Sequence, residues 1–324
     1  MHIQGFANTF LDIKMPVWTP GSYLVREFSK NIEQVSAIKE NGEDLKIYKV
    51  SKNTWRIDNP SDSVLIKYRI YSFEKSVRTN FVDAEHAFLS PAGTFFYVAG
   101  QLHHDATVHV NLPSYWSKIS TGLPKVDNAE NTFYAENFDI LFDSPLEIGN
   151  QDVWSFEAAG IPHEFAMVGV GSYDKDILSY DIKKIVEEET NLWGSNPNDR
   201  YVFITQNYQS AHGGLEHLNS TVLASGRNAY SNAIGYTNFL SLVAHEYFHL
   251  WHVKRLRPKA LGPFNYDEEN YTHLLWIFEG FTAYYDNLIT RRCGFRDELD
   301  YLQALVSEFN MVLNKPGHLV QSVG

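Results

Sequence analysis

The chain has 324 residues, enough for about two domains, and 44% hydrophobic and 20% charged residues are typical of an ordinary globular protein. Its net charge of −12 argues against nucleic acid or an anionic membrane as the main partner. No stretch approaches the ~18 apolar residues of a membrane span. The single cysteine, Cys293, excludes an internal disulfide framework and a cysteine-based metal site. It slightly favours the cytoplasm, although an export signal upstream of Met1 stays open.

The first half of the chain has the pattern of an antiparallel β domain. Short runs rich in valine, isoleucine, tyrosine and phenylalanine alternate with turn residues, and Asn41 followed by Gly42 indicates a hairpin. The expected strands cover residues 10–15, 32–38, 45–50, 64–71, 95–98 and 108–112. We expect an N-terminal β-sandwich-like domain over residues 1–160. The segment 16–23 brackets Trp18 with two prolines and a glycine, which favours a packed turn over a loop lining a cleft.

The second half, residues 161–324, alternates strands and helices and is expected to be an α+β catalytic domain. A helix is expected at 181–192, with Asp181 as its cap and Gly194 after its end. A buried strand is expected at 201–205. The glycine-rich run 213–220 follows and is expected to extend through residues 221–223 as one edge strand, before two apolar helices at 236–257 and 271–292.

The strongest chemical signal is the H-E-x-x-H motif formed by His245, Glu246 and His249. Residues four apart lie on the same face of a helix, so the two imidazoles can bind one Zn²⁺ ion. Glu246 can then act on a water molecule as a general base without being a ligand. Basic residues before Pro258 suit the end of a helix, so the motif is expected in the middle of the helix at 236–257.

Catalytic zinc usually has three protein ligands, and the best third ligand is Glu279. It is the lone carboxylate in the middle of an apolar helix, where a buried charge is costly unless it is paired or binds a metal ion. His252, about two turns from His245, is interpreted as a supporting or surface residue. His273 is a weaker candidate, and the cluster at 103–105 is interpreted as an exposed loop.

Two further carboxylates have candidate roles. Glu216 follows Gly213 and Gly214 at the end of the expected edge strand, where it can hold the protonated α-amino group of a peptide. An exposed glutamate in a glycine turn is the equally weighted alternative. Asp286 lies seven residues after Glu279 on the same helix face and could orient a ligand histidine through its free N–H.

Three sequence strings together resemble the bacterial glycyl aminopeptidases, a family of the gluzincin zinc metallopeptidases. They are PVWTPGSYLVREF at 16–28, GGLEH at 213–217 and HEYFHLWHVKRLRP at 245–258, and WIFEGFT at 276–282 is similar to the wider gluzincin pattern. The resemblance implies an N-terminal β domain and a thermolysin-like peptidase domain. It implies zinc bound by His245, His249 and Glu279, and Glu246 as general base. It also implies that Gly213, Gly214 and Glu216 bind a peptide whose first residue is glycine or alanine.

The chain departs from this family in two ways. His252 stands where members usually carry asparagine, and members continue past the position of Gly324 into a helical segment and a PDZ domain. We therefore expect a fragment truncated at its C-terminus and before Met1, which binds zinc but is weak or inactive as a catalyst. No tyrosine here can be matched to the one that stabilises the family's transition state. The alternatives are a zinc endopeptidase with the same centre and a catalytically weak peptide-binding protein.

Overall fold

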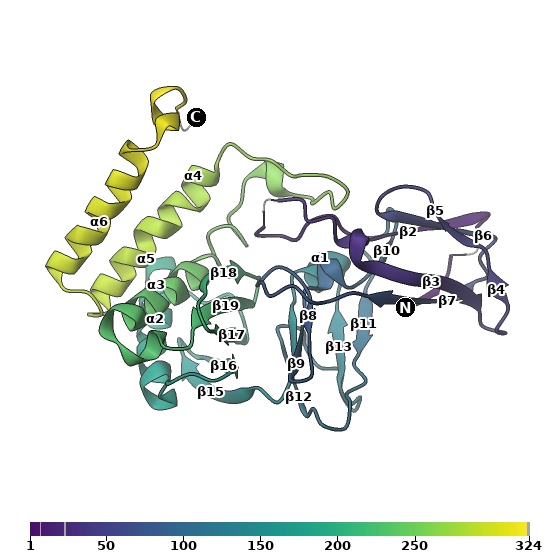
Figure 1. The fold of residues 1–324 in the computed structure, drawn as a ribbon, viewed down its shortest axis with the longest axis horizontal. Coiled ribbons are helices and arrows are strands. Elements are labelled where there is room, and N and C mark those ends of the chain that lie inside the picture. The colour runs from purple at the N-terminus through teal and green to yellow at the C-terminus, as the bar shows by residue number, and fades with distance from the viewer. Residues whose placement is uncertain (7, 23, 323–324) are drawn as a thin grey trace. The chain divides into compact units, whose positions relative to one another are not determined.

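The computed structural model describes residues 1–6, 8–22 and 24–322 (Figure 1). It divides into two compact units. The first unit comprises Met1–Asn150 and Phe264–Asn270, and the second comprises Gln151–Pro263 and Tyr271–Gly324. In the described part of the chain, no helix is long and apolar enough to cross a membrane.

The first unit consists of antiparallel sheets, as the sequence predicted. Its strands are β1 His2–Gln4, β2 Phe10–Lys14, β3 Ile32–Lys39, β4 Asp44–Leu45, β5 Ile47–Lys49, β6 Thr54–Asp58, β7 Ser63–Ile70, β8 Phe81–Val82, β9 His86–Leu89, β10 Tyr97–Val98, β11 Ala106–His109, β12 Lys118–Thr121, β13 Thr132–Ala135 and β14 Leu146–Gly149. They form four sheets with the orders β1-β7-β3-β4, β10-β2-β6-β5, β11-β13 and β12-β14-β9-β8. Helix α1, Phe138–Phe142, and the 3-10 turns Phe28–Asn31 and Pro91–Gly93 complete the unit. The hairpin predicted at Asn41 and Gly42 joins β3 to β4.

A segment from late in the sequence, Phe264–Asn270, belongs to the core of the first unit. Tyr266 is 1% exposed, and its ring stacks on that of Trp18 with the centroids 5.7 Å apart. The indole N–H of Trp18 donates to the carbonyl of Asn265 over 2.7 Å. Trp18 itself is 3% exposed, so the packed-turn interpretation of segment 16–23 is confirmed, except that Tyr23 lies outside the described residues.

The second unit is built on one five-stranded sheet of order β15-β16-β17-β19-β18. Its strands are β15 Asp152–Ala158, β16 Ile161–Val168, β17 Tyr201–Tyr208, β18 His212–Glu216 and β19 Ser220–Gly226. Its helices are α2 Lys175–Trp193, α3 Ala233–Phe248, α4 Leu275–Phe278, α5 Gly280–Arg292 and α6 Glu298–Leu313, with 3-10 turns at Ala229–Ser231, Lys259–Leu261 and Pro316–Leu319. Strands β16, β17 and β19 are parallel, while β15 and β18 pair antiparallel at the two edges.

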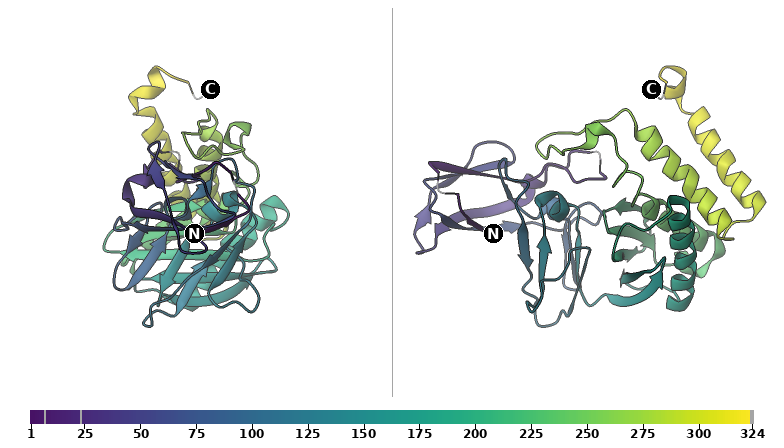
Figure 2. Two further views of the ribbon diagram at one scale, coloured as in Figure 1. Left: turned by 90° about the vertical axis from the view of Figure 1, so that its right-hand side faces the viewer. Right: turned by 180° about the vertical axis from the view of Figure 1, so that it is seen from behind.

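The sheet and helices of the second unit share one apolar core. Phe203 of β17 and Leu223 of β19 pack with Ile182 of α2, Val243 of α3 and Ile289 of α5, and all five are completely buried. Helix α2 begins earlier than predicted, because Asp174 rather than Asp181 caps it and accepts from two backbone N–H groups. The helix α6 folds back from the C-terminal end of α5 (Figure 2).

The glycine-rich run forms two strands, so the prediction of one extended edge strand is wrong. Strand β18 ends at Glu216, and β19 begins at Ser220 and returns antiparallel to it. The register pairs Gly214 with Leu223 and Glu216 with Thr221. A tight turn in between reverses the chain, so that β18 is the edge strand and β19 lies inside the sheet.

The helix that carries the histidine motif is also shifted from its predicted range. It begins at Ala233 and ends at Phe248, so the motif lies in its last turn rather than in its middle. The sequence has no glycine or proline there, and side chains end the helix instead. The Nδ1 atom of His249 donates to the carbonyl of His252 over 2.9 Å, and Arg255 donates to the carbonyl of Leu250 over 2.8 Å. These bonds satisfy carbonyl groups beyond the last helical residue, and the chain turns at Val253, whose φ is +114°.

The second predicted helix is interrupted at Glu279. Helix α4 ends at Phe278 and α5 begins at Gly280, while Glu279 itself has φ −97° and ψ −43°. Glycine has poor helix propensity, which makes this position a natural place for a break. The prediction of one helix from 271 to 292 is therefore wrong at its start, which is Leu275, and at Glu279. Helical hydrogen bonds nevertheless run through Glu279, because its N–H donates to the carbonyl of Leu275 over 2.7 Å and its carbonyl accepts from Ala283 over 2.8 Å.

Candidate metal centre

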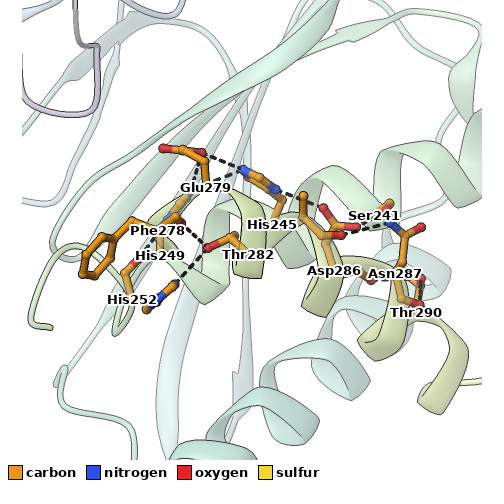
Figure 3. Close-up of polar contacts among 11 residues, drawn as sticks. Ser241, His245, His249, His252, Phe278, Glu279, Thr282, Asp286, Asn287 and Thr290 are labelled. Carbon is orange, nitrogen blue, oxygen red and sulfur yellow. Dashed lines mark hydrogen bonds and ion pairs between the residues drawn. The ribbon is translucent and has the colours of Figure 1, made fainter. Parts of the chain in front are cut away.

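Two imidazoles from the end of α3 face each other. The Nε2 atoms of His245 and His249 lie 3.2 Å apart (Figure 3). The side chain of His249 is 1% exposed and that of His245 is 22% exposed. Their spacing of four residues near the end of one helix brings both rings to the same spot.

Glu279 brings a carboxylate to the same spot from the junction of α4 and α5. Its Oε2 atom lies 3.6 Å from the Nε2 atom of His245 and 3.6 Å from that of His249. The side chain of Glu279 is 40% exposed, so the prediction of a buried carboxylate is wrong. The exposed part of this carboxylate leaves one side of the site open to solvent.

The opposite nitrogen of each imidazole is held by an acceptor. The Nδ1 atom of His245 lies 3.0 Å from Oδ2 of Asp286, and Ser241 donates to Oδ1 of the same carboxylate over 3.2 Å. The Nδ1 atom of His249 lies 2.9 Å from the carbonyl of His252. An ionised carboxylate and a carbonyl only accept, so each Nδ1 is the donor. Each neutral ring then presents the lone pair of its Nε2 atom to the shared spot.

This donor set fits a small divalent cation. Two lone pairs that face each other over 3.2 Å repel unless a positive charge lies between them. Tetrahedral zinc, with Zn–N distances of about 2.0–2.1 Å, keeps its ligand atoms roughly 3.3 Å apart. Burial would lower the pKa of His245, but Asp286 and Glu279 outweigh it and raise that pKa well above its usual value. The acidic neighbours thus attract positive charge to this spot, and His245, His249 and Glu279 form the candidate metal site.

Two buried carboxylates lie beside the candidate metal site. One ligand atom each from Glu216, Glu246 and His249 lie within 4.8 Å of one another. Glu216 is 4% exposed and stands at the end of edge strand β18, so it is not an exposed residue of a glycine turn. Glu246 is 5% exposed, and burial, reinforced by Glu216 and opposed by His245, raises its pKa to about 7. Among the described residues, Oε1 of Glu216 and Oε2 of Glu246 have no hydrogen-bond partner.

The structure decides between the two interpretations of His252 and adds Glu189, which the sequence analysis did not assign. His252 is 5% exposed rather than a surface residue, and its main-chain carbonyl orients His249. Glu189 of α2 is completely buried, and burial together with Asp286 raises its pKa well above the usual value. A sequence signal for Glu189 existed, because it follows Ile182, Ile185 and Val186 on the apolar face of α2.

The remaining histidines weighed as metal ligands, and the acidic residue beside two of them, have exposed side chains. His103, His104 and His273 are exposed, as is Asp105. Burial raises the pKa of Cys293 to about 12, so its thiol stays protonated and is no nucleophile.

Comparisons with known proteins agree with this architecture. Residues 1–150 match the Peptidase M61 N-terminal domain, and residues 238–324 match the M61 glycyl aminopeptidase family. A search of curated proteins found no match.

Two solved structures are similar to the chain. The structure of an aminopeptidase N family protein from Idiomarina loihiensis has 34% sequence identity and a TM-score of 0.89, over 93% of this chain and 53% of the other. Legionella pneumophila aminopeptidase A, solved in complex with aspartic acid, has 12% identity and a TM-score of 0.53, over 88% of this chain and 34% of the other. This second likeness is one of fold alone. The chain thus spans about half the length of the first relative, at 53%. Because both halves match one family, and a solved relative agrees over 93% of the residues, the chain belongs to the M61 glycyl aminopeptidase family of metallopeptidases.

Proposed function

We propose that the protein is a zinc-dependent aminopeptidase that removes a small first residue, glycine or alanine, from peptides. The observation that carries the proposal is the facing pair of Nε2 atoms, 3.2 Å apart, with a carboxylate oxygen 3.6 Å from each. His245, His249 and Glu279 would hold the metal ion. The nitrogen and oxygen donors suit zinc, and family membership supports a peptide substrate.

Glu246 acts as the general base in this proposal. Zinc held at the site would polarise the scissile carbonyl and lower the pKa of the attacking water. Glu246 takes a proton from that water and passes it to the leaving amine. Burial, reinforced by Glu216 and opposed by His245, raises the pKa of Glu246 above its ordinary value, which favours a carboxylate that can accept and return a proton. Its burial excludes bulk water that would compete for the same proton.

Glu216 supplies the preference for a free amino terminus. Its carboxylate is buried within reach of Glu246, and one of its oxygen atoms has no hydrogen-bond partner among the described residues. A protonated α-amino group would donate a hydrogen bond to that oxygen and would neutralise the negative charge of the Glu216 carboxylate. The edge strand β18 offers main-chain groups to an extended peptide. Holding the amino terminus at Glu216 places the first peptide bond beside Glu246, so that cleavage occurs one residue into the peptide.

The test measures bound metal and turnover together. We expect the purified protein to bind one equivalent of zinc by elemental analysis and to hydrolyse glycine and alanine 4-nitroanilides, but not their N-acetylated forms. Glu246→Gln is expected to lower kcat by about 100–10,000-fold, since general-base catalysis contributes that much, while zinc stays bound. Glu216→Gln is expected to raise KM for free-amine substrates, whereas Glu157→Gln, at an exposed position of β15, serves as its matched control.

Each alternative function predicts a different result. Cleavage of N-acetylated peptides at internal bonds would replace the proposal by an endopeptidase. Zinc binding and peptide binding without any turnover, at every peptide length tried, would replace it by a peptide-binding protein. Failure to bind zinc would contradict both the proposal and the endopeptidase alternative.

A further inference from the structure

The two glycines of edge strand β18 have different surroundings. Successive residues of a strand point to opposite faces, so Gly214 and Glu216 share one face of β18. Gly213 has a φ of +150°, and a Cβ atom built on it meets nothing within 4 Å. Position 213 therefore favours glycine because of its backbone conformation and not because of close neighbours. Gly214 has no such φ, and its surroundings are crowded.

The side chain of Glu246 fills the space that a side chain at position 214 would need. A Cβ atom on Gly214 would lie 2.2 Å from Oε1, 2.4 Å from Cδ and 2.5 Å from Cγ of Glu246. Real Cβ atoms essentially never approach a heavy atom closer than 3.0 Å. The carboxylate of Glu246 therefore rests directly on the backbone of β18, at the place where an ordinary strand residue would project. Any residue other than glycine forces this carboxylate to move.

The same arrangement fixes the spacing between Glu246 and Glu216. Glu216 projects two residues after Gly214 on the same face of β18, and ligand atoms of the two carboxylates lie within 4.8 Å. Glycine in a strand weakens the strand, and it often marks a close approach of another group. Here the approaching group is a side chain of helix α3, which contributes the motif histidines as well.

We propose that Gly214 is a positioning residue for Glu246. By lacking a side chain it admits the carboxylate to β18 and sets the distance between the general base and the group that holds the substrate's amino terminus. This inference rests on the proposed function for its catalytic consequence only. The steric relationship between Gly214 and Glu246 stands on the structure and is tested separately.

The catalytic test uses Gly214→Ala in the zinc-loaded protein. We expect kcat for glycine 4-nitroanilide to fall about 100-fold, because a displacement of about 1 Å at a reacting group costs that much. Zinc content is expected to stay within about twofold, since His245, His249 and Glu279 keep their places. The matched control is Gly226→Ala at the end of β19, where a Cβ atom would meet only the carbonyl of Ala211 at 4.0 Å. An unchanged kcat in Gly214→Ala would overturn the inference.

A double-mutant cycle on stability tests the steric relationship without using activity. Gly214→Ala is expected to lower Tm in the native background but not in Glu246→Ala, which removes the three atoms that collide. If Gly214→Ala alone does not fold, the double variant is expected to fold. Equal Tm losses in both backgrounds, or a double variant that also fails to fold, would overturn the inference. Absence of aminopeptidase activity in the native protein, with the cycle still non-additive, would instead contradict the proposed function.

Discussion

The carboxylate of Asp286 lies 3.0 Å from the Nδ1 atom of His245, on the side of the ring away from the candidate metal site. This contact fixes the tautomer in which Nε2 carries the lone pair, and it increases the basicity of that nitrogen. Ser241 holds the carboxylate in turn, with its hydroxyl donating over 3.2 Å. Asp286 is thus expected to act on the metal through His245, without touching it.

Replacing Asp286 by asparagine is expected to weaken zinc binding by about 10–100-fold, because the supporting carboxylate no longer fixes the ring. The measurement is competition for zinc with a chromophoric chelator. Asp181→Asn is the matched control, since Asp181 accepts a hydrogen bond from Tyr236 over 2.9 Å but lies away from the histidines. Equal zinc affinities in the two variants would contradict the role given to Asp286.

Removing the metal ion is expected to lower the thermal stability of the protein. A ligand that binds only the folded state adds about 4 kcal/mol when its concentration is 1,000 times Kd. Treatment with a chelator should therefore lower Tm, and added zinc should restore it. In His249→Ala, which loses one of the three candidate ligands, the chelator should leave Tm unchanged. A chelator shift of the same size in His249→Ala would show that the metal ion binds elsewhere.

Glu189 is expected to make the stability of the protein depend on pH. Burial, reinforced by Asp286, raises its pKa in the folded state, so the folded state keeps a proton that the unfolded state releases above its usual pKa. The stability contribution of this group therefore falls as pH rises from the unfolded pKa towards the folded one. Glu189→Gln has no carboxyl proton to release, so its free energy of unfolding does not fall with pH for this reason.

We expect Glu189→Gln to have a higher Tm than the native protein at pH 8, with a difference that shrinks towards pH 4.5. Thermal unfolding across this range measures it. Glu187→Gln, on the same helix with a side chain that is 45% exposed, should show no such trend. A constant difference between Glu189→Gln and native protein at every pH would contradict the raised pKa.

Trp18→Ala is expected to destabilise the first unit by about 3–5 kcal/mol, as is usual for removing a buried tryptophan. The side chain is 3% exposed, stacks on Tyr266 and donates to the carbonyl of Asn265. Denaturant unfolding followed by circular dichroism measures the loss. Tyr115→Ala provides the comparison, because that aromatic side chain is in the same unit and 63% exposed. A loss for Trp18→Ala no larger than for Tyr115→Ala would mean that the segment Phe264–Asn270 is not part of this core.

Local patterns were enough to predict several strands of the first unit, among them β2, β3 and β7, and to single out the residues of the candidate centre, but they missed β1, β6, β8, β9 and β12 to β14. The pairing of β3 with β4 at Asn41 and Gly42 depends on turn chemistry that is written in two adjacent residues. His245 and His249 needed only the helical period. In both cases the determining interactions lie within a few residues of each other in the chain.

The errors arose where tertiary contacts decide the local structure. The end of helix α3 is an exception, because the imidazole of His249 donates there to the carbonyl of His252 only three residues ahead, a local contact that the helical period does not predict. The break at Glu279 lies in a run of apolar residues whose period favours one continuous helix. Glu189 was visible on the apolar face of α2, but its relation to Asp286 depends on how α2 and α5 pack together.

The path of the chain between its candidate metal ligands has a consequence for how the two units can be separated. After His249 and before Glu279, the chain leaves the second unit for seven residues, Phe264–Asn270, and builds Tyr266 into the core of the first. A fragment that consists of residues 151–324 alone would therefore lack the core in which Tyr266 is buried. Its segment Phe264–Asn270, which lies between the candidate ligands His249 and Glu279, would be exposed. Cutting the chain between the two units would therefore separate Tyr266 from the ring of Trp18 on which it stacks.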